Sequence, residues 1–247
     1  CEHGIATLTP ERPIDILADL RALKADVFVV SSYGRILPKV IVDLPPHGSV
    51  NVHPSLLPRW RGATPVPATI KAGDETSGIT IIVMDEKMDH GPILDQVEAP
   101  VPLKATTATY LHELMRLGAE RLPDVLVRFV DDTITPVAQD HDRATFCKLL
   151  SRDDGRIDWS RATEEIERTV RAYDPWPGTW TEIQDSGAWK RLKLLKAHTD
   201  STLLVGTSNP TLAINGGLVH VGQLVIDRLQ FESKKPILGT DLAATSD

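Results

Sequence analysis

Helix-like and strand-like segments alternate through the first third of the chain, and this alternation constrains the fold most. Apolar residues at helical spacing mark three segments, and short apolar runs rich in β-branched residues lie between them. In chain order, the predicted helices and strands cover residues 14–23, 27–31, 38–44, 48–53, 65–72 and 78–84. Such alternation predicts an α/β domain with a mostly parallel sheet and helices on its faces.

The pattern changes after a long amphipathic helix that is predicted over 107–130. A polar stretch follows, then a helix over 163–173 and a series of short apolar runs. These runs cover residues 180–183, 192–195, 203–205, 211–214, 218–221 and 224–226. Asn215-Gly216-Gly217 predicts a hairpin turn, and six short strands suggest a small β-barrel. We therefore expect a first domain over 1–140, a linker over 141–158 and a second domain over 159–247.

Composition excludes several classes of protein. Of the 247 residues, 41% are hydrophobic and 25% are charged, as in ordinary soluble globular proteins. No apolar run approaches the roughly 20 residues of a membrane span, and no signal-peptide pattern opens the chain. Cys1 and Cys147 form neither a disulfide framework nor a metal-binding pattern, which favours the cytoplasm. Because the net charge is −7, any nucleic acid would need a local basic patch.

Three side chains are candidates for chemistry. Asn51 and His53 lie two residues apart on a predicted strand, so they share one face at its carboxyl end. Asp89 follows the next predicted strand, in a glycine-bearing loop that can meet them at the edge where open parallel sheets bind ligands. Each residue alone is also a common turn former or half-buried polar group. Together, an amide, an imidazole and a carboxylate predict an acyl-transfer site that needs no metal.

The residues around this trio resemble a known family. The run 51–62 reads Asn-Val-His-Pro-Ser-Leu-Leu-Pro-Arg-Trp-Arg-Gly, and Met88-Asp89-His90-Gly91 follows. This combination is similar to the 10-formyltetrahydrofolate-dependent formyltransferases. The spelling of 57–63, together with Asp-Pro-Trp-Pro-Gly over 174–178, resembles the branch that acts on methionyl initiator tRNA. The similarity covers nearly the whole chain. It implies a Rossmann-like formyltransferase domain followed by an OB-like β-barrel.

The resemblance also implies roles for individual residues. Asn51, His53 and Asp89 match the family's catalytic positions. The formyl donor, 10-formyltetrahydrofolate, is expected beside the segment after the strand 27–31 and beside the loop that carries Asp89, with no metal ion. The implied donor-binding residues are Tyr33, Gly34, Arg35, Ile36, Leu37, Ser55, Leu56, Leu57, Pro58, Asp85 and Gly91.

Two basic segments are candidates for contact with tRNA. Arg59 and Arg61 flank Trp60, an arrangement that suits a phosphate and a base, although a loop pinned by a buried tryptophan is an equal alternative. The second segment lies in the expected barrel, where a solvated strand face is the alternative; its basic residues are Lys190, Arg191, Lys193 and Lys196. The family implies initiator methionyl-tRNA as partner, a monomer and a cytoplasmic location.

Other functions remain open at this stage. A sugar-nucleotide N-formyltransferase shares the trio, whereas phosphoribosylglycinamide formyltransferases lack a second domain of this kind, and a folate hydrolase would use water in place of the amine. The chain opens without a leading strand, so we expect that roughly 50 residues, about one βαβ unit, are missing. A short carboxyl-terminal tail is a further expected loss. Such a fragment is expected to fold poorly or to act only as a tRNA-binding remnant.

Overall fold

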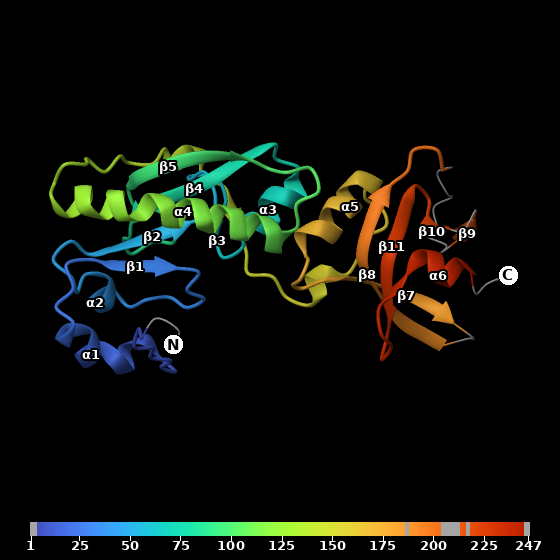
Figure 1. Cartoon of the computed structure of the whole chain (residues 1–247), viewed down its shortest axis with the longest axis horizontal. Helices are drawn as coiled ribbons and strands as arrows, with labels where there is room; N and C mark the ends of the chain where they lie inside the picture. The colour runs from blue at the N-terminus through green and yellow to red at the C-terminus, as the bar shows by residue number, and fades with distance from the viewer. Residues whose placement is uncertain (1–3, 186–187, 204–212, 216–217, 245–247) are drawn as a thin grey trace. The chain divides into compact units, whose positions relative to one another are not determined.

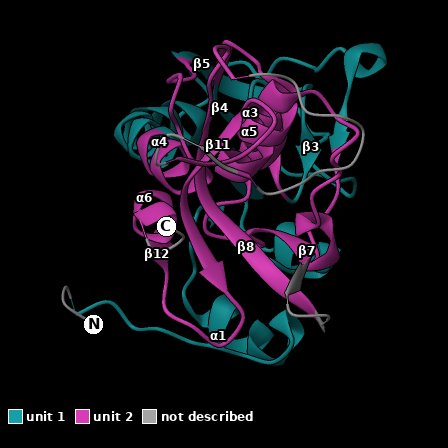
Figure 2. Ribbon diagram, turned by 90° about the vertical axis from the view of Figure 1, so that its right-hand side faces the viewer, with its two compact units in different colours: residues 1–63, 78–99, 114–146 teal, residues 64–77, 100–113, 147–247 magenta. Residues whose placement is uncertain are grey.

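The structure is a computed structural model of the chain, and it describes residues 4–185, 188–203, 213–215 and 218–244. Contacts divide the chain into two compact units, coloured in Figure 2. Unit 1 comprises residues 1–63, 78–99 and 114–146, and unit 2 comprises 64–77, 100–113 and 147–247. The expected strand 203–205 and the turn at Gly216-Gly217 fall mostly or wholly outside the described residues.

Unit 1 is built around a four-stranded sheet in the order β1-β2-β4-β5 (Figure 1). The strands are β1 (Phe28–Ser31), β2 (Ser49–His53), β4 (Thr76–Val83) and β5 (Ile93–Pro100). Before β2 lie η1 (Pro13–Ile16), α1 (Leu17–Ala22) and α2 (Lys39–Val42). After it come β3 (Arg61–Gly62), α4 (Thr107–Val130), η2 (His141–Arg143) and β6 (Phe146–Cys147), of which β3 and β6 form a separate two-stranded sheet.

The mixed α/β class is confirmed, but the sheet is less parallel than expected. β1 pairs with β2 in parallel, as predicted. β2 and β4 are antiparallel, with Asn51 opposite Ile82 and His53 opposite Thr80. Hydrophobic runs give the positions of strands and not their directions, so the sequence could not distinguish these two pairings. β5, which the sequence analysis missed, completes the sheet beside β4.

Helix α4 covers one face of this sheet, as Figure 1 shows. A Cβ atom on Gly118 would lie 2.8 Å from Cγ1 of Val52 and 3.1 Å from Cγ1 of Ile79, so the helix approaches the strands closely there. Val50 and Val52 are at most 4% exposed on that face. Because side chains alternate along a strand, Asn51 and His53 point to the opposite face.

Unit 2 contains an antiparallel sheet in the order β7-β8-β11-β10-β9, with β12 paired to β11. Its strands are β7 (Thr179–Asp185), β8 (Ala188–Thr199), β9 (Ala213–Asn215), β10 (Leu218–Val221), β11 (Leu224–Phe231) and β12 (Ile237–Leu238). Its helices are α3 (Pro65–Ala72), η3 (Asp153–Gly155), α5 (Thr163–Ala172) and α6 (Gly239–Ala244). Leu192, Leu194, Leu224 and Leu229, each at most 1% exposed, form the centre of its core.

Candidate active site

The structure brings the three candidate side chains of unit 1 together. Oδ1 of Asp89 lies 3.2 Å from Nδ2 of Asn51, which donates to it, and 3.5 Å from Nδ1 of His53. Oδ2 of Asp89 accepts a hydrogen bond of 2.7 Å from the backbone N–H of Gly62. The carboxylate therefore lies between an amide, an imidazole and a backbone donor.

His53 is held from its other side by a backbone carbonyl. Its Nε2 lies 3.0 Å from the carbonyl oxygen of Trp60, which can only accept, so Nε2 carries the proton in the neutral ring. Nδ1 then faces Asp89. Burial of His53, which is 4% exposed, lowers the pKa of the imidazole, and the nearby Asp89 charge and the Trp60 carbonyl oppose that shift in part. Burial therefore outweighs the two contributions that raise this pKa.

Asp89 reaches the trio by a route that differs from the expected one. Since β4 is antiparallel to β2, the carboxyl ends of the two strands lie at opposite ends of the sheet. The loop after β4 instead folds back over the face that carries Asn51. Asp89 adopts a left-handed backbone, with φ of 50°. Gly91 packs so close to the strand that a Cβ would lie 1.8 Å from the carbonyl oxygen of Val83. The trio therefore lies on one face of the sheet near the carboxyl end of β2, and not at a carboxyl edge that β2 shares with β4.

The loop between His53 and Trp60 is compact and internally bonded. Oγ of Ser55 donates to the carbonyl oxygen of Arg59 at 2.6 Å, and Oγ1 of Thr80 donates to that of Ser55 at 2.6 Å. Thr80 also accepts from the N–H of Leu57 at 3.1 Å. Ser55 and Leu57 are buried, whereas Leu56 and Pro58 are half-buried. The buried members of this loop thus support its shape, and Leu56 and Pro58 retain accessible surface.

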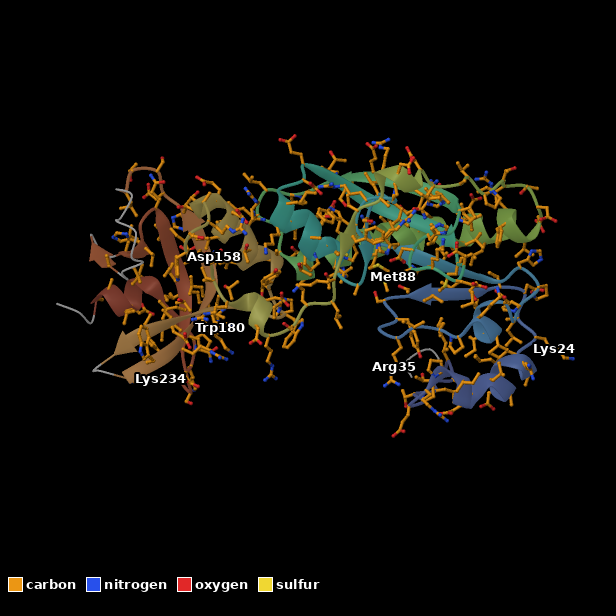
Figure 3. The ribbon with its side chains drawn as sticks, turned by 180° about the vertical axis from the view of Figure 1, so that it is seen from behind. Lys24, Arg35, Met88, Asp158, Trp180 and Lys234 are labelled. Carbon is orange, nitrogen blue, oxygen red and sulfur yellow. The ribbon has the colours of Figure 1, made fainter. Side chains whose placement is uncertain are left out.

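The other donor-binding candidates in unit 1 are more open. Tyr33, Gly34, Arg35 and Ile36 are exposed between β1 and α2, and Leu37 is half-buried. Arg35, labelled in Figure 3 with Met88, lies toward the same end of the unit as Met88 in that view. Asp85 is exposed; its carboxylate accepts from the N–H of Lys87 at 2.9 Å and lies 2.6 Å from Nδ1 of His90.

The Arg-Trp-Arg segment divides into an outer and an inner part. Arg59 is exposed and stacks over the Trp60 ring at 4.4 Å. Arg61 is only 4% exposed, and its guanidinium donates to Oε1 of Gln139 at 3.2 and 2.7 Å and lies 2.8 Å from Nδ1 of His141. The expectation that Arg61 meets tRNA is not supported by this geometry, because its charge is directed into the protein.

The second basic segment lies on β8 of unit 2. Arg191 and Lys193 are exposed and alternate with the buried Leu192 and Leu194, so they occupy the outer face of the strand. Lys190 and Lys196 are exposed as well, and Lys196 lies beside a break in the register between β8 and β11. The guanidinium of Arg191 lies 4.0 Å from the centroid of the Trp180 ring, a residue that Figure 3 labels.

Sequence reasoning missed the residues that surround the trio. Gln139 and His141, which lie at or beside the expected linker, contact Arg61, and His90 stacks on His141 with ring centroids 4.0 Å apart. These residues carry no local motif, and only the tertiary fold brings them to the site. In the described part of the chain, no group of three or more His, Cys, Asp or Glu side chains could hold a metal ion. No described helix is long and apolar enough to cross a membrane.

Comparison with known proteins gives the family of the chain. The family model described as formyl transferase matches residues 3–126, and that of the formyl transferase C-terminal domain matches 149–246. The chain belongs to the formyltransferase family. The methionyl-tRNA formyltransferase of Roseiflexus castenholzii is 43% identical to this formyltransferase, over 96% of this chain and 77% of the relative. That of Pseudoalteromonas translucida is 37% identical, over 97% of this chain and 76% of the relative.

Solved structures share the fold of this formyltransferase at low identity. HypX from Aquifex aeolicus, in complex with tetrahydrofolic acid, matches with a TM-score of 0.70 and 20% identity, over 94% of this chain and 41% of that one. The N-formyltransferase from Helicobacter canadensis, in complex with folinic acid and dTDP-3-aminofucose, matches with a TM-score of 0.61 and 17% identity, over 81% of this chain and 71% of that one. These structures show the fold, and the family models together with the curated relatives show that the chain is a formyltransferase enzyme.

Proposed function

We propose that this formyltransferase moves a formyl group from 10-formyltetrahydrofolate to the α-amino group of methionyl initiator tRNA. The acceptor is supported by relatives named methionyl-tRNA formyltransferase, which share up to 43% identity with most of the chain. The observation that carries the chemistry is the contact of Asp89 with both Asn51 and His53. Such a reaction belongs to the cytoplasm, and a monomer suffices for it because all three side chains come from one chain.

The residues present suit a folate donor. Among the described hydrogen bonds, none satisfies the backbone groups of residues 33–37 from within the protein, so these groups are free to bind the donors and acceptors of a pterin ring. Leu56 and Pro58 offer half-buried apolar surface near the trio, and Asp85 and Gly91 belong to the loop that carries Asp89. Nδ2 of Asn51 has a second N–H beyond the one given to Asp89. We assign donor binding to these two segments and their neighbours.

The trio Asn51, His53 and Asp89 can supply the groups that formyl transfer to an amine requires. The α-amino group of an aminoacyl ester has a pKa near or below about 7.7–8.0, so a useful fraction is neutral at pH 7. Its nitrogen bonds to the formyl carbon, and the bond from that carbon to the folate nitrogen breaks. Asn51 donates its free N–H to the carbonyl oxygen as negative charge develops there, an effect of about 10²–10³ in rate at comparable sites. Asp89 takes the proton that the ammonium loses, and the same proton, passed on through Nδ1 of His53, reaches the departing nitrogen.

Transfer RNA contacts are assigned to exposed cationic side chains and to the half-buried ring of Trp60. Arg59 stacked on Trp60 offers a charge and a ring face close to the loop that holds His53. On β8 the proposed contacts with phosphate are Lys190, Arg191, Lys193 and Lys196. In this proposal residues 1–140 form the catalytic domain, 141–158 the linker and 159–247 an OB-like tRNA-binding domain.

The test compares two acceptors in separate reactions. The protein that carries this chain is incubated with 10-formyltetrahydrofolate and either charged initiator methionyl-tRNA or an amino-sugar nucleotide. Formylmethionyl-tRNA as the product, lost in His53→Ala, supports the proposal. Transfer only to the sugar nucleotide refutes the acceptor and retains the chemistry. Loss of the formyl group to water without transfer identifies a hydrolase.

A further inference from the structure

Gln139 joins three segments of unit 1 with a single buried side chain. Its Nε2 donates to the carbonyl oxygen of Asp89 at 2.9 Å and to that of Gly91 at 2.7 Å. Its Oε1 accepts from Nε and Nη2 of Arg61. A side-chain amide has two N–H donors and one oxygen with two lone pairs, so every hydrogen-bonding position of Gln139 is used. The residue is 6% exposed.

Backbone pairing places Gln139 at this point. Val137 and Ile93 exchange two backbone hydrogen bonds, of 2.7 and 2.8 Å, in an antiparallel bridge. Because the two segments are antiparallel, Gln139, two residues after Val137, lies opposite Gly91, two residues before Ile93. Nη2 of Arg61 in turn contacts both Oε1 of Gln139 and Nδ1 of His141. The pairing of Val137 with the start of β5 therefore sets the position of the segment before η2, and this places Gln139 beside the loop of Asp89.

The loop needs such support, because its conformation is not a relaxed one. A non-glycine residue at φ of 50° is in a sparsely populated region, and Asp89 occupies it. Without Gln139 the carbonyl oxygens of Asp89 and Gly91 would lose their donors. The buried guanidinium of Arg61 would also lose the acceptor that Gln139 provides. Leaving a buried donor without its acceptor lowers the free energy of unfolding. Small shifts of this loop change the distances from the Asp89 carboxylate to Asn51 and His53.

We propose that Gln139 is a positioning residue that holds the carboxylate of Asp89 at its working distance from Asn51 and His53. This role rests on the formyl transfer proposed above, in which Asp89 accepts a proton. Gln139 touches no reacting atom and acts through the backbone of the loop. His53 is faced by one charged group, Asp89, among the described contacts. The other charged or titratable side chains of the loop and its contacts are Lys39, Arg61, Asp85, Glu86, Lys87, His90 and His141.

Two substitutions separate the contacts of Gln139. Gln139→Glu keeps acceptors for Arg61, removes both donors to the loop and adds a negative charge beside it. Gln139→Met keeps the length of the side chain and removes all of its hydrogen bonds. Val125→Ala is the matched control: Val125 is 1% exposed on α4, so its truncation lowers stability without touching the loop.

We expect Gln139→Glu to lower kcat about tenfold to a hundredfold, as displaced catalytic groups commonly do, with little change in KM for the formyl donor. The second readout needs no activity: the pH titration of the His53 ring nitrogens, followed by NMR in all three variants and the unaltered protein. As Asp89 moves away, its support for the imidazolium weakens, so the midpoint moves to lower pH in Gln139→Met, which adds no charge, and stays in place in Val125→Ala.

The outcomes are distinct. An unchanged His53 midpoint in folded Gln139→Met overturns the positioning role, whatever the activity. An equal loss of kcat in Val125→Ala also overturns it, because loss of stability alone would then be the cause. If the unaltered protein transfers no formyl group while the midpoint still moves, the proposed function fails and the positioning of Asp89 by Gln139 stands.

Discussion

Oδ2 of Asp89 accepts a 2.7 Å hydrogen bond from the backbone N–H of Gly62, so the loop after β4 is tied by its carboxylate to the short strand β3. The same carboxylate uses Oδ1 for Asn51 and His53. One side chain therefore fixes the geometry of the candidate site and supplies its negative charge.

Asn51→Ala is expected to lower kcat about 10²–10³-fold, because it removes the donor assigned to the developing oxyanion. Asn51 is half-buried at the middle of β2, and its truncation leaves the strand pairing unchanged. The affinity for the formyl donor should change far less than kcat. Steady-state kinetics together with folate binding by calorimetry measure both quantities. An equal loss of affinity and kcat would show that Asn51 serves ground-state binding instead.

Gly91→Ala is expected to disrupt the site more severely than its size suggests. The added Cβ would lie 1.8 Å from the carbonyl oxygen of Val83, an overlap that only a backbone shift can relieve. Such overpacking costs about 1–3 kcal/mol or more of folding free energy and moves the loop that carries Asp89. The melting temperature and kcat should both fall. Gly34→Ala, at an exposed position where a Cβ meets nothing within 4 Å, is the control and should leave the melting temperature close to that of the unaltered protein.

Stability should fall as the pH drops through the range where histidine titrates. Burial lowers the pKa of His53 in the folded protein, and burial with nearby positive groups lowers that of His141. The unfolded chain then takes up protons, from about pH 6.5 downward, that the folded protein does not bind. The stabilisation is therefore complete above that pH and is lost below it. His53→Gln keeps a donor for the Trp60 carbonyl. Its free energy of unfolding, measured by denaturant titration, should fall less between pH 7 and pH 5 than that of the unaltered protein. An equal fall in both proteins would contradict this origin.

Lys193→Glu on β8 should weaken the use of tRNA while leaving the transfer chemistry intact. Lys193 is exposed between the buried Leu192 and Leu194, so the change alters surface charge without touching the core. KM for methionyl-tRNA should rise, and the rise should shrink at high salt because phosphate contacts are screened. Lys234→Glu, another exposed lysine of unit 2, is the matched control. Equal effects of both changes would indicate net charge instead of a contact at β8.

Local signals in the sequence predicted individual elements well. The predicted helix 65–72 coincides with α3, because Pro65 suits a first turn and Gly73, at φ of 77°, ends the helix. The predicted helix 107–130 coincides with α4. The meeting of Asn51, His53 and Asp89 was also anticipated, although the reason given for it, a shared carboxyl edge, was wrong.

What the sequence did not reveal depends on contacts between distant residues. β5 has polar residues at Asp95, Gln96 and Glu98, so its apolar pattern is weak, and the strand exists because it pairs with β4. Arg61 reads as a surface cation beside a tryptophan, and only the fold shows that Gln139, far along the chain, surrounds its charge. Neither the direction of β4 nor the role of Gln139 leaves a local pattern.

The most direct test of the account is a single-turnover measurement of formyl transfer to methionyl initiator tRNA by Asp89→Asn. Asparagine retains an acceptor for Gly62 N–H and nearly the same shape, so folding and folate binding should persist. The loss of the proton acceptor should slow the chemical step about 10²–10⁴-fold. A rate within a few-fold of that of the unaltered protein, in a variant that folds and binds donor normally, would contradict the assignment of Asp89 and, with it, the proposed site.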